Sequence, residues 1–81
     1  MTHRRSERFK RSFKKLPLAV RRAFYKQVEF LLKDLQHPSL HAKRYDEASG
    51  LWQARVTRNV RFYFLIDNGT YLLVDIQKHK D

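Results

Sequence analysis

The spacing of apolar residues changes once along this chain, near Pro38, and this change constrains the fold more than any other feature. Before Pro38, apolar residues recur every three or four positions, and after it they recur every second position. The first spacing is typical of amphipathic helices, and the second of strands with one buried face. Helices followed by a run of strands predict an α+β domain, here a single domain over residues 1–81.

Two helices are predicted in the first part. The first begins after Ser6, a candidate N-cap, and its apolar residues are Phe9, Phe13 and Leu16. Pro17 ends it and suits the first position of the next helix. That helix ends at His37-Pro38 and has an apolar stripe of Val20, Phe24, Val28, Leu31 and Leu35. Because the connection is short, the two helices should form an antiparallel hairpin.

An antiparallel sheet of three to four strands is predicted in the second part, with the helices packed on one face. Residues 51–57, 60–66 and 71–77 alternate between apolar and polar side chains, and 42–46 form a weaker candidate strand. Asp67-Asn68-Gly69-Thr70 indicates a hairpin, since Asn-Gly suits the positive φ angles of a type I′ turn. Residues 1–5 are polar and basic, which is unlike a typical strand.

Counting residues outward from the Asn68-Gly69 turn separates the two faces of this sheet. The count pairs Ile66 with Tyr71, Phe64 with Leu73, and Phe62 with Asp75. We expect the helices to cover this Phe-rich face. The opposite face then holds Arg61, Tyr63, Leu65, Leu72, Val74 and Ile76, and Gln53 and Arg55 join it if the 57–60 turn keeps register. The same count puts His79 on the Phe-rich face, and only a bulge or the end of pairing near Gln77 would turn it toward Arg61.

Charge limits the partners of this protein. Lysine and arginine number 18 against 8 acidic residues, a formal charge of +10, while 42% of residues are apolar. The charge therefore belongs to a folded domain, and it would attract RNA, DNA, anionic membrane or an acidic protein. No cysteine is present for disulfides or thiolate metal sites. No apolar run suits a membrane span or a signal peptide, so we expect a cytoplasmic protein.

Few residues suggest chemistry, and neither a metal nor a cofactor is expected. His37 and His41 are separated by Pro38, which prevents a helical ligand pair. Arg55, Arg58 and Arg61 have two interpretations: solvated strand residues paired with nearby carboxylates, or a clamp for a phosphodiester. His79, flanked by Lys78 and Lys80, is either a solvated tail residue or a group that exchanges a proton.

Over nearly its whole length the chain resembles the RelE/ParE superfamily of bacterial toxin–antitoxin toxins. Two segments precede the strands, Ser-Glu-Arg-Phe-Lys-Arg-Ser-Phe-Lys-Lys-Leu-Pro at 6–17 and His-Pro-Ser-Leu-His-Ala-Lys-Arg-Tyr at 37–45. The others are Gly-Leu-Trp-Gln-Ala-Arg-Val at 50–56, Val-Arg-Phe-Tyr-Phe-Leu-Ile-Asp at 60–67 and Lys-His-Lys at 78–80. The resemblance implies a short first strand at residues 1–5, two helices and a further antiparallel sheet.

The resemblance also implies a function. Many members are ribosome-dependent endoribonucleases that cut mRNA in the ribosomal A site without a metal, by attack of the ribose 2′-OH on the adjacent phosphate. Arg55 and Arg61 would bind the scissile phosphate, and His79 would act as general base or acid. Further RNA contacts would come from Gln53, Arg58, Lys43, Arg44, Lys78 and Lys80. The implied partners are mRNA, rRNA and an acidic cognate antitoxin.

Two alternatives stay open at this point. The YoeB-like branch has an aromatic residue after the histidine, where this chain has Lys80, and a glutamate near Ala42 or Lys43 that is absent here. Both differences favour a ParE-like toxin, which would inhibit DNA gyrase without nuclease activity. The other alternative is a catalytically degenerate module that binds RNA or an antitoxin.

Overall fold

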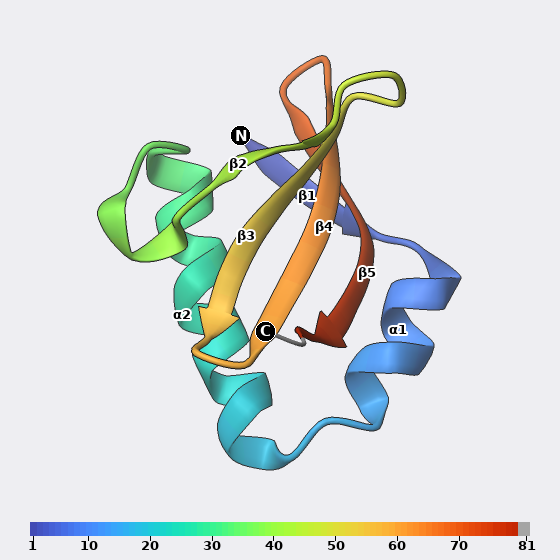
Figure 1. Ribbon diagram of the computed structural model, residues 1–81, viewed down its shortest axis with the longest axis vertical. Coiled ribbons are helices and arrows are strands. Elements are labelled where there is room, and N and C mark those ends of the chain that lie inside the picture. Colours follow the sequence, from blue (N-terminus) through green and yellow to red (C-terminus); the bar gives the residue numbers. More distant parts are fainter. Residues whose placement is uncertain (80–81) are drawn as a thin grey trace.

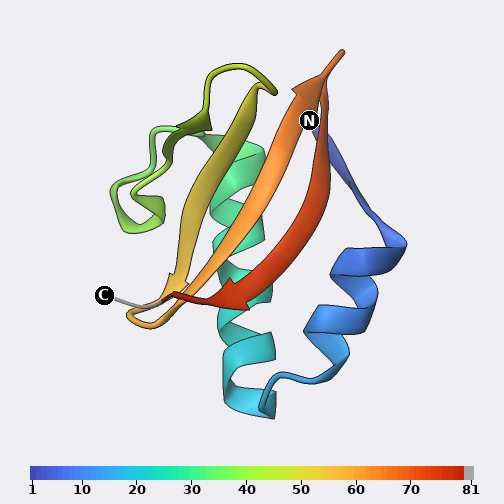
Figure 2. The same ribbon diagram turned by 45° about the vertical axis from the view of Figure 1, so that its right-hand side comes forward.

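Two helices lie against one face of a twisted sheet in this computed structural model, which describes residues 1–79 (Figures 1 and 2). The chain begins with β1 (Thr2–Arg5), α1 (Glu7–Lys14) and α2 (Leu18–Lys33). A short 3₁₀ helix, η1 (Pro38–Leu40), leads to β2 (Lys43–Asp46). The chain ends with β3 (Leu51–Thr57), β4 (Val60–Asp67) and β5 (Thr70–Lys78). The predicted α+β class is therefore confirmed.

The sheet has five strands in the order β1-β5-β4-β3-β2. Four of them form the predicted antiparallel meander, including the weak candidate as β2. The fifth, β1, pairs in parallel with β5, with Thr2 opposite Thr70 and Arg5 opposite Leu73. The expectation of a purely antiparallel sheet of three to four strands was wrong on this point. An edge strand is paired on one side only, so the mostly exposed side chains of β1 can be polar.

Both helices run over the predicted face in opposite directions (Figure 1). Ser6 caps α1, because its Oγ accepts the Phe9 N–H at 3.0 Å. The second helix ends at Lys33, earlier than predicted, where Asp34 takes an extended backbone and its Oδ1 accepts the Gln36 N–H at 2.9 Å. No helix in residues 1–79 has the length and apolar character that a membrane span requires.

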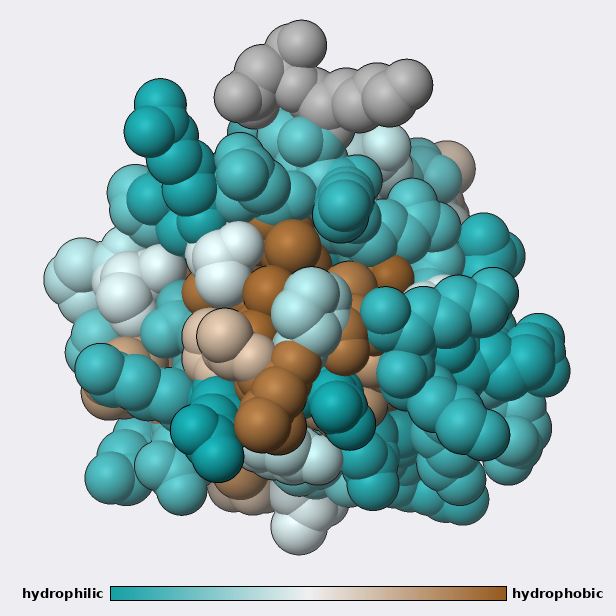
Figure 3. All heavy atoms as spheres, turned by 90° about the horizontal axis from the view of Figure 1, so that it is seen from below, coloured by the Kyte–Doolittle hydropathy of each residue, from teal (hydrophilic) through white to brown (hydrophobic). Residues whose placement is uncertain are grey.

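The core is aromatic and lies between the helices and the Phe-rich face of the sheet. Phe9, Phe24, Phe62 and Phe64 are fully buried. The ring centroid of Phe24 lies 5.2 Å from that of Phe9 and 5.4 Å from that of Phe62, so α1, α2 and β4 meet at this ring. Seen from the end that carries the α1–α2 connection, apolar residues gather in the centre and hydrophilic residues surround them (Figure 3). The prediction that the helices cover the Phe-rich face is confirmed.

A β-bulge in β5 changes the predicted register. Phe64 opposes Leu73 as predicted, but Tyr63 opposes Asp75 and Phe62 opposes Ile76. Val74 is therefore an extra residue in β5, and the predicted pairing of Phe62 with Asp75 was wrong. Straight counting also put Ile76 on the open face, whereas Ile76 is 1% exposed in the core. Beyond the bulge, every β5 side chain lies on the face opposite to the predicted one.

The first helix holds this bulge in place. The Ser6 N–H donates to the Leu73 carbonyl at 3.0 Å, and the Ser6 Oγ–H donates to the Val74 carbonyl at 2.8 Å. Asp75 is buried, and its Oδ2 lies 3.1 Å from the Nε of Arg8 on α1. Its Oδ1 accepts the Ile76 N–H at 2.9 Å, and Gln77 donates to Oδ2. The N-cap and first turn of α1 thus bind three successive residues around the bulge, Leu73, Val74 and Asp75.

These bonds decide the charge state of Asp75. Burial would raise the pKa of its carboxyl, but hydrogen bonds from Ser12, the Ile76 N–H and Gln77 favour the carboxylate, as does the Arg8 charge. The net result is a pKa below the ordinary value. A group with a lowered pKa in the folded state stabilises the protein above its unfolded pKa, and this stabilisation is lost as the pH falls through the folded pKa.

Asp75→Asn should therefore lower the free energy of unfolding by about 1–3 kcal/mol near pH 7, because charged hydrogen bonds to α1 are lost. The difference from the wild type should shrink as the pH falls below about 4, where the wild-type carboxylate becomes protonated. Urea denaturation between pH 3 and pH 7 measures both effects. Asp67→Asn changes an exposed carboxylate on the neighbouring strand and is the control; equal losses in both variants would contradict the role given to Asp75.

Ser6→Ala should cost about 1–2 kcal/mol of unfolding free energy, because the N-cap bond of α1 and the bond to Val74 disappear together. Ser6→Thr keeps the hydroxyl and should retain most of this stability. Thermal and urea denaturation of the two variants test the assignment. If alanine and threonine destabilise the protein equally, the Ser6 hydroxyl does not hold the bulge.

Candidate functional site

The open face of the sheet carries a basic cavity of about 370 Å³ at the end where β3 and β4 connect. We call it the basic cleft, and its lining residues are His41, Ala42, Lys43, Gln53, Arg55, Arg61 and His79. They come from the η1–β2 segment, β3, β4 and the residue after β5. Five residues predicted from the sequence as candidate site residues, Lys43, Gln53, Arg55, Arg61 and His79, thus line one cavity.

His79 reaches the cleft because of the bulge at Val74. With the bulge, Gln77 opposes Arg61 across the β4–β5 pair, so the next residue on the same face is His79. The His79 N–H donates to the Asn59 carbonyl at 2.6 Å, which extends the strand pairing beyond Lys78. The prediction from straight counting that His79 lies on the Phe-rich face was wrong, and the bulge named as the exception is present.

Arg55 and Arg61 lie directly opposite each other on β3 and β4. The expectation that Gln53 and Arg55 share a face with Arg61 is confirmed, although the register shifts between Arg55 and Thr57. Two like charges in directly opposed positions destabilise a sheet, and an anion between them would remove this repulsion. The pair is therefore easier to explain as an anion site than as a packing device.

The two guanidinium groups are bound differently. Nη1 of Arg61 donates to the Thr57, Arg58 and Val60 carbonyls at 2.8, 3.1 and 3.1 Å, which fixes the side chain against the β3–β4 turn. Nε of Arg55 is buried and has no hydrogen-bond partner within residues 1–79. A buried donor without an acceptor is costly, so the Arg55 guanidinium is less firmly held by hydrogen bonds than that of Arg61 in the described residues.

The nearby carboxylates do not neutralise these arginines in the described part of the chain. Asp75 pairs with Arg8, and Glu47 pairs with Arg44 at 3.3 Å. Asp46 accepts from the Ala48 N–H and the Ser49 hydroxyl at the end of β2. The interpretation of Arg55, Arg58 and Arg61 as partners of these acids is therefore not supported by the ion pairs found in residues 1–79.

Gln27 on α2 supports the cleft from behind. Its buried Nε2 donates to the Arg55 carbonyl at 2.9 Å and to the Ser39 carbonyl at 3.1 Å. The Ser39 hydroxyl donates in return to the Gln27 Oε1 at 3.3 Å. One amide thus joins α2, η1 and the backbone at Arg55. Sequence reasoning missed Gln27, although a polar residue on the apolar face of a helix was a signal for such a buried bond.

Three predicted contact residues, Arg44, Arg58 and Lys78, do not line the cleft. Arg58 lies in the exposed turn between β3 and β4. The Arg44 guanidinium lies 5.1 Å from the centroid of the Trp52 ring, and it therefore lies on the other face of the sheet. Lys78 is exposed at the end of β5. Lys80 lies outside the described residues.

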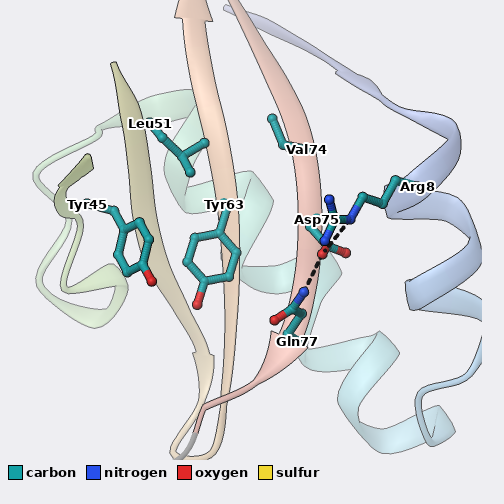
Figure 4. A pocket seen from close by; sticks show the side chains of 7 residues that line it. All are labelled: Arg8, Tyr45, Leu51, Tyr63, Val74, Asp75 and Gln77. Atoms are coloured by element: carbon teal, nitrogen blue, oxygen red, sulfur yellow. Dashed lines mark hydrogen bonds and ion pairs between the residues drawn. The ribbon is translucent and has the colours of Figure 1, made fainter. Parts of the chain in front are cut away.

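A second cavity of about 220 Å³ lies beside the basic cleft on the same open face (Figure 4). We call it the tyrosine pocket, and it is lined by Arg8, Tyr45, Leu51, Tyr63, Val74, Asp75 and Gln77. The rings of Tyr45 and Tyr63 meet edge to face, with centroids 5.1 Å apart. Burial, Tyr45 and Asp75 raise the pKa of the Tyr63 hydroxyl against the opposing effect of Arg61, so this phenol is protonated at neutral pH. Sequence reasoning did not identify this pocket.

The chemistry available in the cleft is anion binding and proton exchange. Residues 1–79 contain no group of three or more metal-ligating side chains close enough to hold an ion. The cleft offers two arginines, one lysine and two imidazoles, those of His41 and His79, around a space open to solvent. Such a set can bind a phosphodiester and move a proton at one of its oxygens.

This chain resembles known proteins in its fold, although its sequence matches none of them closely. No family model matches the sequence, and no curated protein matches it significantly. A YoeB/ParE toxin from Agrobacterium tumefaciens superposes with a TM-score of 0.80 at 10% identity, covering 99% of this chain and 100% of that chain. The YoeB dimer from Staphylococcus aureus gives 0.81 at 8% identity, covering 99% and 98%.

A third similar structure was solved as a complex of a toxin with its antitoxin. The toxin of the intact E. coli RelBE toxin–antitoxin complex superposes with a TM-score of 0.75 at 13% identity, covering 99% of this chain and 98% of that chain. These likenesses extend over whole chains, including β1 and both helices. At such low identities they establish the fold, and this chain has the fold of the RelE, ParE and YoeB toxins.

Proposed function

We propose that this protein is the toxin of a type II toxin–antitoxin system and that it cleaves mRNA on the ribosome without a metal. One observation carries the proposal: Arg55, Arg61 and His79 line a single cleft, although straight strand counting would separate His79 from the arginines. His79 is not a free tail residue. The bulge in β5 turns it toward the cleft, and its N–H donates to the Asn59 carbonyl at 2.6 Å.

In this mechanism the ribose 2′ oxygen attacks the adjacent phosphorus, and the bond from phosphorus to the 5′ oxygen breaks. The products are a 2′,3′-cyclic phosphate and a free 5′-hydroxyl. His79 takes the 2′-OH proton, and the 5′ oxygen receives a proton from the imidazolium or from water. Arg55 and Arg61 bind the phosphate as its negative charge grows.

The charge of the protein supports the proposed partners. A formal charge of +10 on 81 residues favours mRNA and rRNA, and it also favours an acidic antitoxin. One structure with the same fold is a toxin–antitoxin complex from E. coli. An acidic antitoxin that covers the basic cleft would block RNA by charge and by volume together.

A second candidate function is supported by the lining of the cleft. None of its seven residues is a carboxylate, so the second proton would have to come from His41 or from water and not from an acid such as the YoeB-like glutamate. A ParE-like toxin that binds DNA gyrase needs no such acid. In that case expression of the protein would leave mRNA intact while broken DNA accumulates.

Replacing Arg55 or Arg61 by Ala should lower the rate of ribosome-dependent mRNA cleavage by about 10²–10³, the usual loss for one group that stabilises transition-state charge. His79→Ala should lower it by about 10²–10⁴ through lost proton transfer. Mapping of cleaved mRNA with purified ribosomes measures these rates. Arg22→Ala removes the same charge from the exposed surface of α2 and should cleave at the wild-type rate.

Because Arg61 also binds three carbonyls of the β3–β4 turn, its variant should be compared with Arg61→Lys, which keeps the charge. Thermal unfolding of each variant separates loss of fold from loss of chemistry. If the Arg55→Ala and His79→Ala variants fold and still cleave mRNA at the wild-type rate, the proposed mechanism is wrong.

A further inference from the structure

The tyrosine pocket is not used by the phosphate chemistry of the basic cleft. We propose that it holds a nucleobase of the RNA whose phosphate lies in the cleft, with Tyr45 stacking on the base and Gln77 accepting a hydrogen bond from it. This assignment rests on the proposed function and makes Tyr45 and Gln77 residues that determine specificity.

The pocket and the cleft are neighbours along β4. Tyr63 lines the pocket and Arg61 lines the cleft, two residues apart on the same face and so separated by ~6.6 Å along the strand. Gln77, which also lines the pocket, lies directly opposite Arg61. An RNA phosphate held by Arg61 would therefore place its neighbouring base beside the tyrosines.

Tyr45 has the exposure of a stacking residue. Its side chain is 58% exposed on the open face, and its ring is oriented by the edge-to-face contact with Tyr63, with 67° between the ring planes. An aromatic ring held on an open sheet face is the usual platform on which proteins stack RNA bases. Leu51 and Val74 line the other end of the pocket with apolar surface (Figure 4).

Gln77 supplies an acceptor with a fixed orientation. Its Nε2 donates to the Asp75 carboxylate, which as an anion can only accept, so its Oε1 must face away from Asp75. In Figure 4 this oxygen points toward the tyrosine side of the pocket. An acceptor at this position selects a base with an exocyclic amino group, such as adenine.

The charges of the pocket favour a neutral base over an acidic peptide side chain. Nε of Arg8 lies 3.1 Å from Oδ2 of Asp75, so the positive charge of Arg8 is neutralised by the Asp75 carboxylate. A second carboxylate from a peptide would be repelled by Asp75. A planar, uncharged ring with a hydrogen-bond donor at its edge meets no such repulsion.

Binding of two RNA trinucleotides tests the assignment. One is tri-adenosine and the other is tri-purine riboside, which lacks the amino group, and both carry 2′-O-methyl groups that prevent cleavage. Wild-type protein should bind tri-adenosine about tenfold more tightly, and Gln77→Leu should abolish this preference. Tyr45→Ala should weaken binding of both trinucleotides about tenfold, because base–aromatic stacking is lost.

Tyr25→Ala is the matched control, because Tyr25 is 52% exposed on α2, away from the open face. Equal affinities of the Tyr45→Ala and Tyr25→Ala proteins, or equal binding of both trinucleotides by the wild type, would overturn the assignment. Failure of tri-adenosine to bind at millimolar concentration would also overturn it. If the base preference holds while ribosome-dependent cleavage is absent, the pocket stands and the nuclease function fails.

Discussion

The extra residue in β5 is the constraint on which the arrangement of this protein depends. Before Val74 in the sequence, the pairing of Phe64 with Leu73 keeps the Phe-rich face against the helices. After Val74, Ile76 lies in the core, and Gln77 and His79 lie on the open face. A regular strand would bury Gln77 and expose Ile76, so the bulge serves the core and the candidate site together.

The candidate site contains two arginines whose positive charges are not paired with carboxylates in the described residues. Arg55 and Arg61 oppose each other across β3 and β4, and the nearby carboxylates in residues 1–79 are bound elsewhere. Hydrogen bonds to turn carbonyls hold Arg61, and Gln27 holds the backbone of Arg55 from the helix side. The protein thus places two cations at opposed positions and fixes the Arg61 side chain, which favours binding of an anion over stability of the sheet.

Solved toxins share this architecture over whole chains at 8–13% identity. Such a likeness can persist because the fold requires patterns rather than particular residues: an apolar stripe on each helix, alternation along the strands and a tight turn. The functional proposals need specific side chains, and they rest on the cleft and pocket of this chain. The tyrosine pocket lies next to the cleft along β4, so phosphate and base recognition would use neighbouring sites on the same face of the sheet.

The sequence by itself determined the elements that depend on near neighbours: the Ser6 cap, both helices, the alternation of β3 and β4, and the Asn68-Gly69 turn. Both turn residues have the positive φ angles that were predicted, 44° and 79°. Only the tertiary structure decided the parallel pairing of β1 and the bulge at Val74. The bond that anchors this bulge joins Ser6 to a residue 68 positions away, and residue spacing along a strand carries no signal of it. The position of His79 beside Arg55 and Arg61 follows from that distant bond.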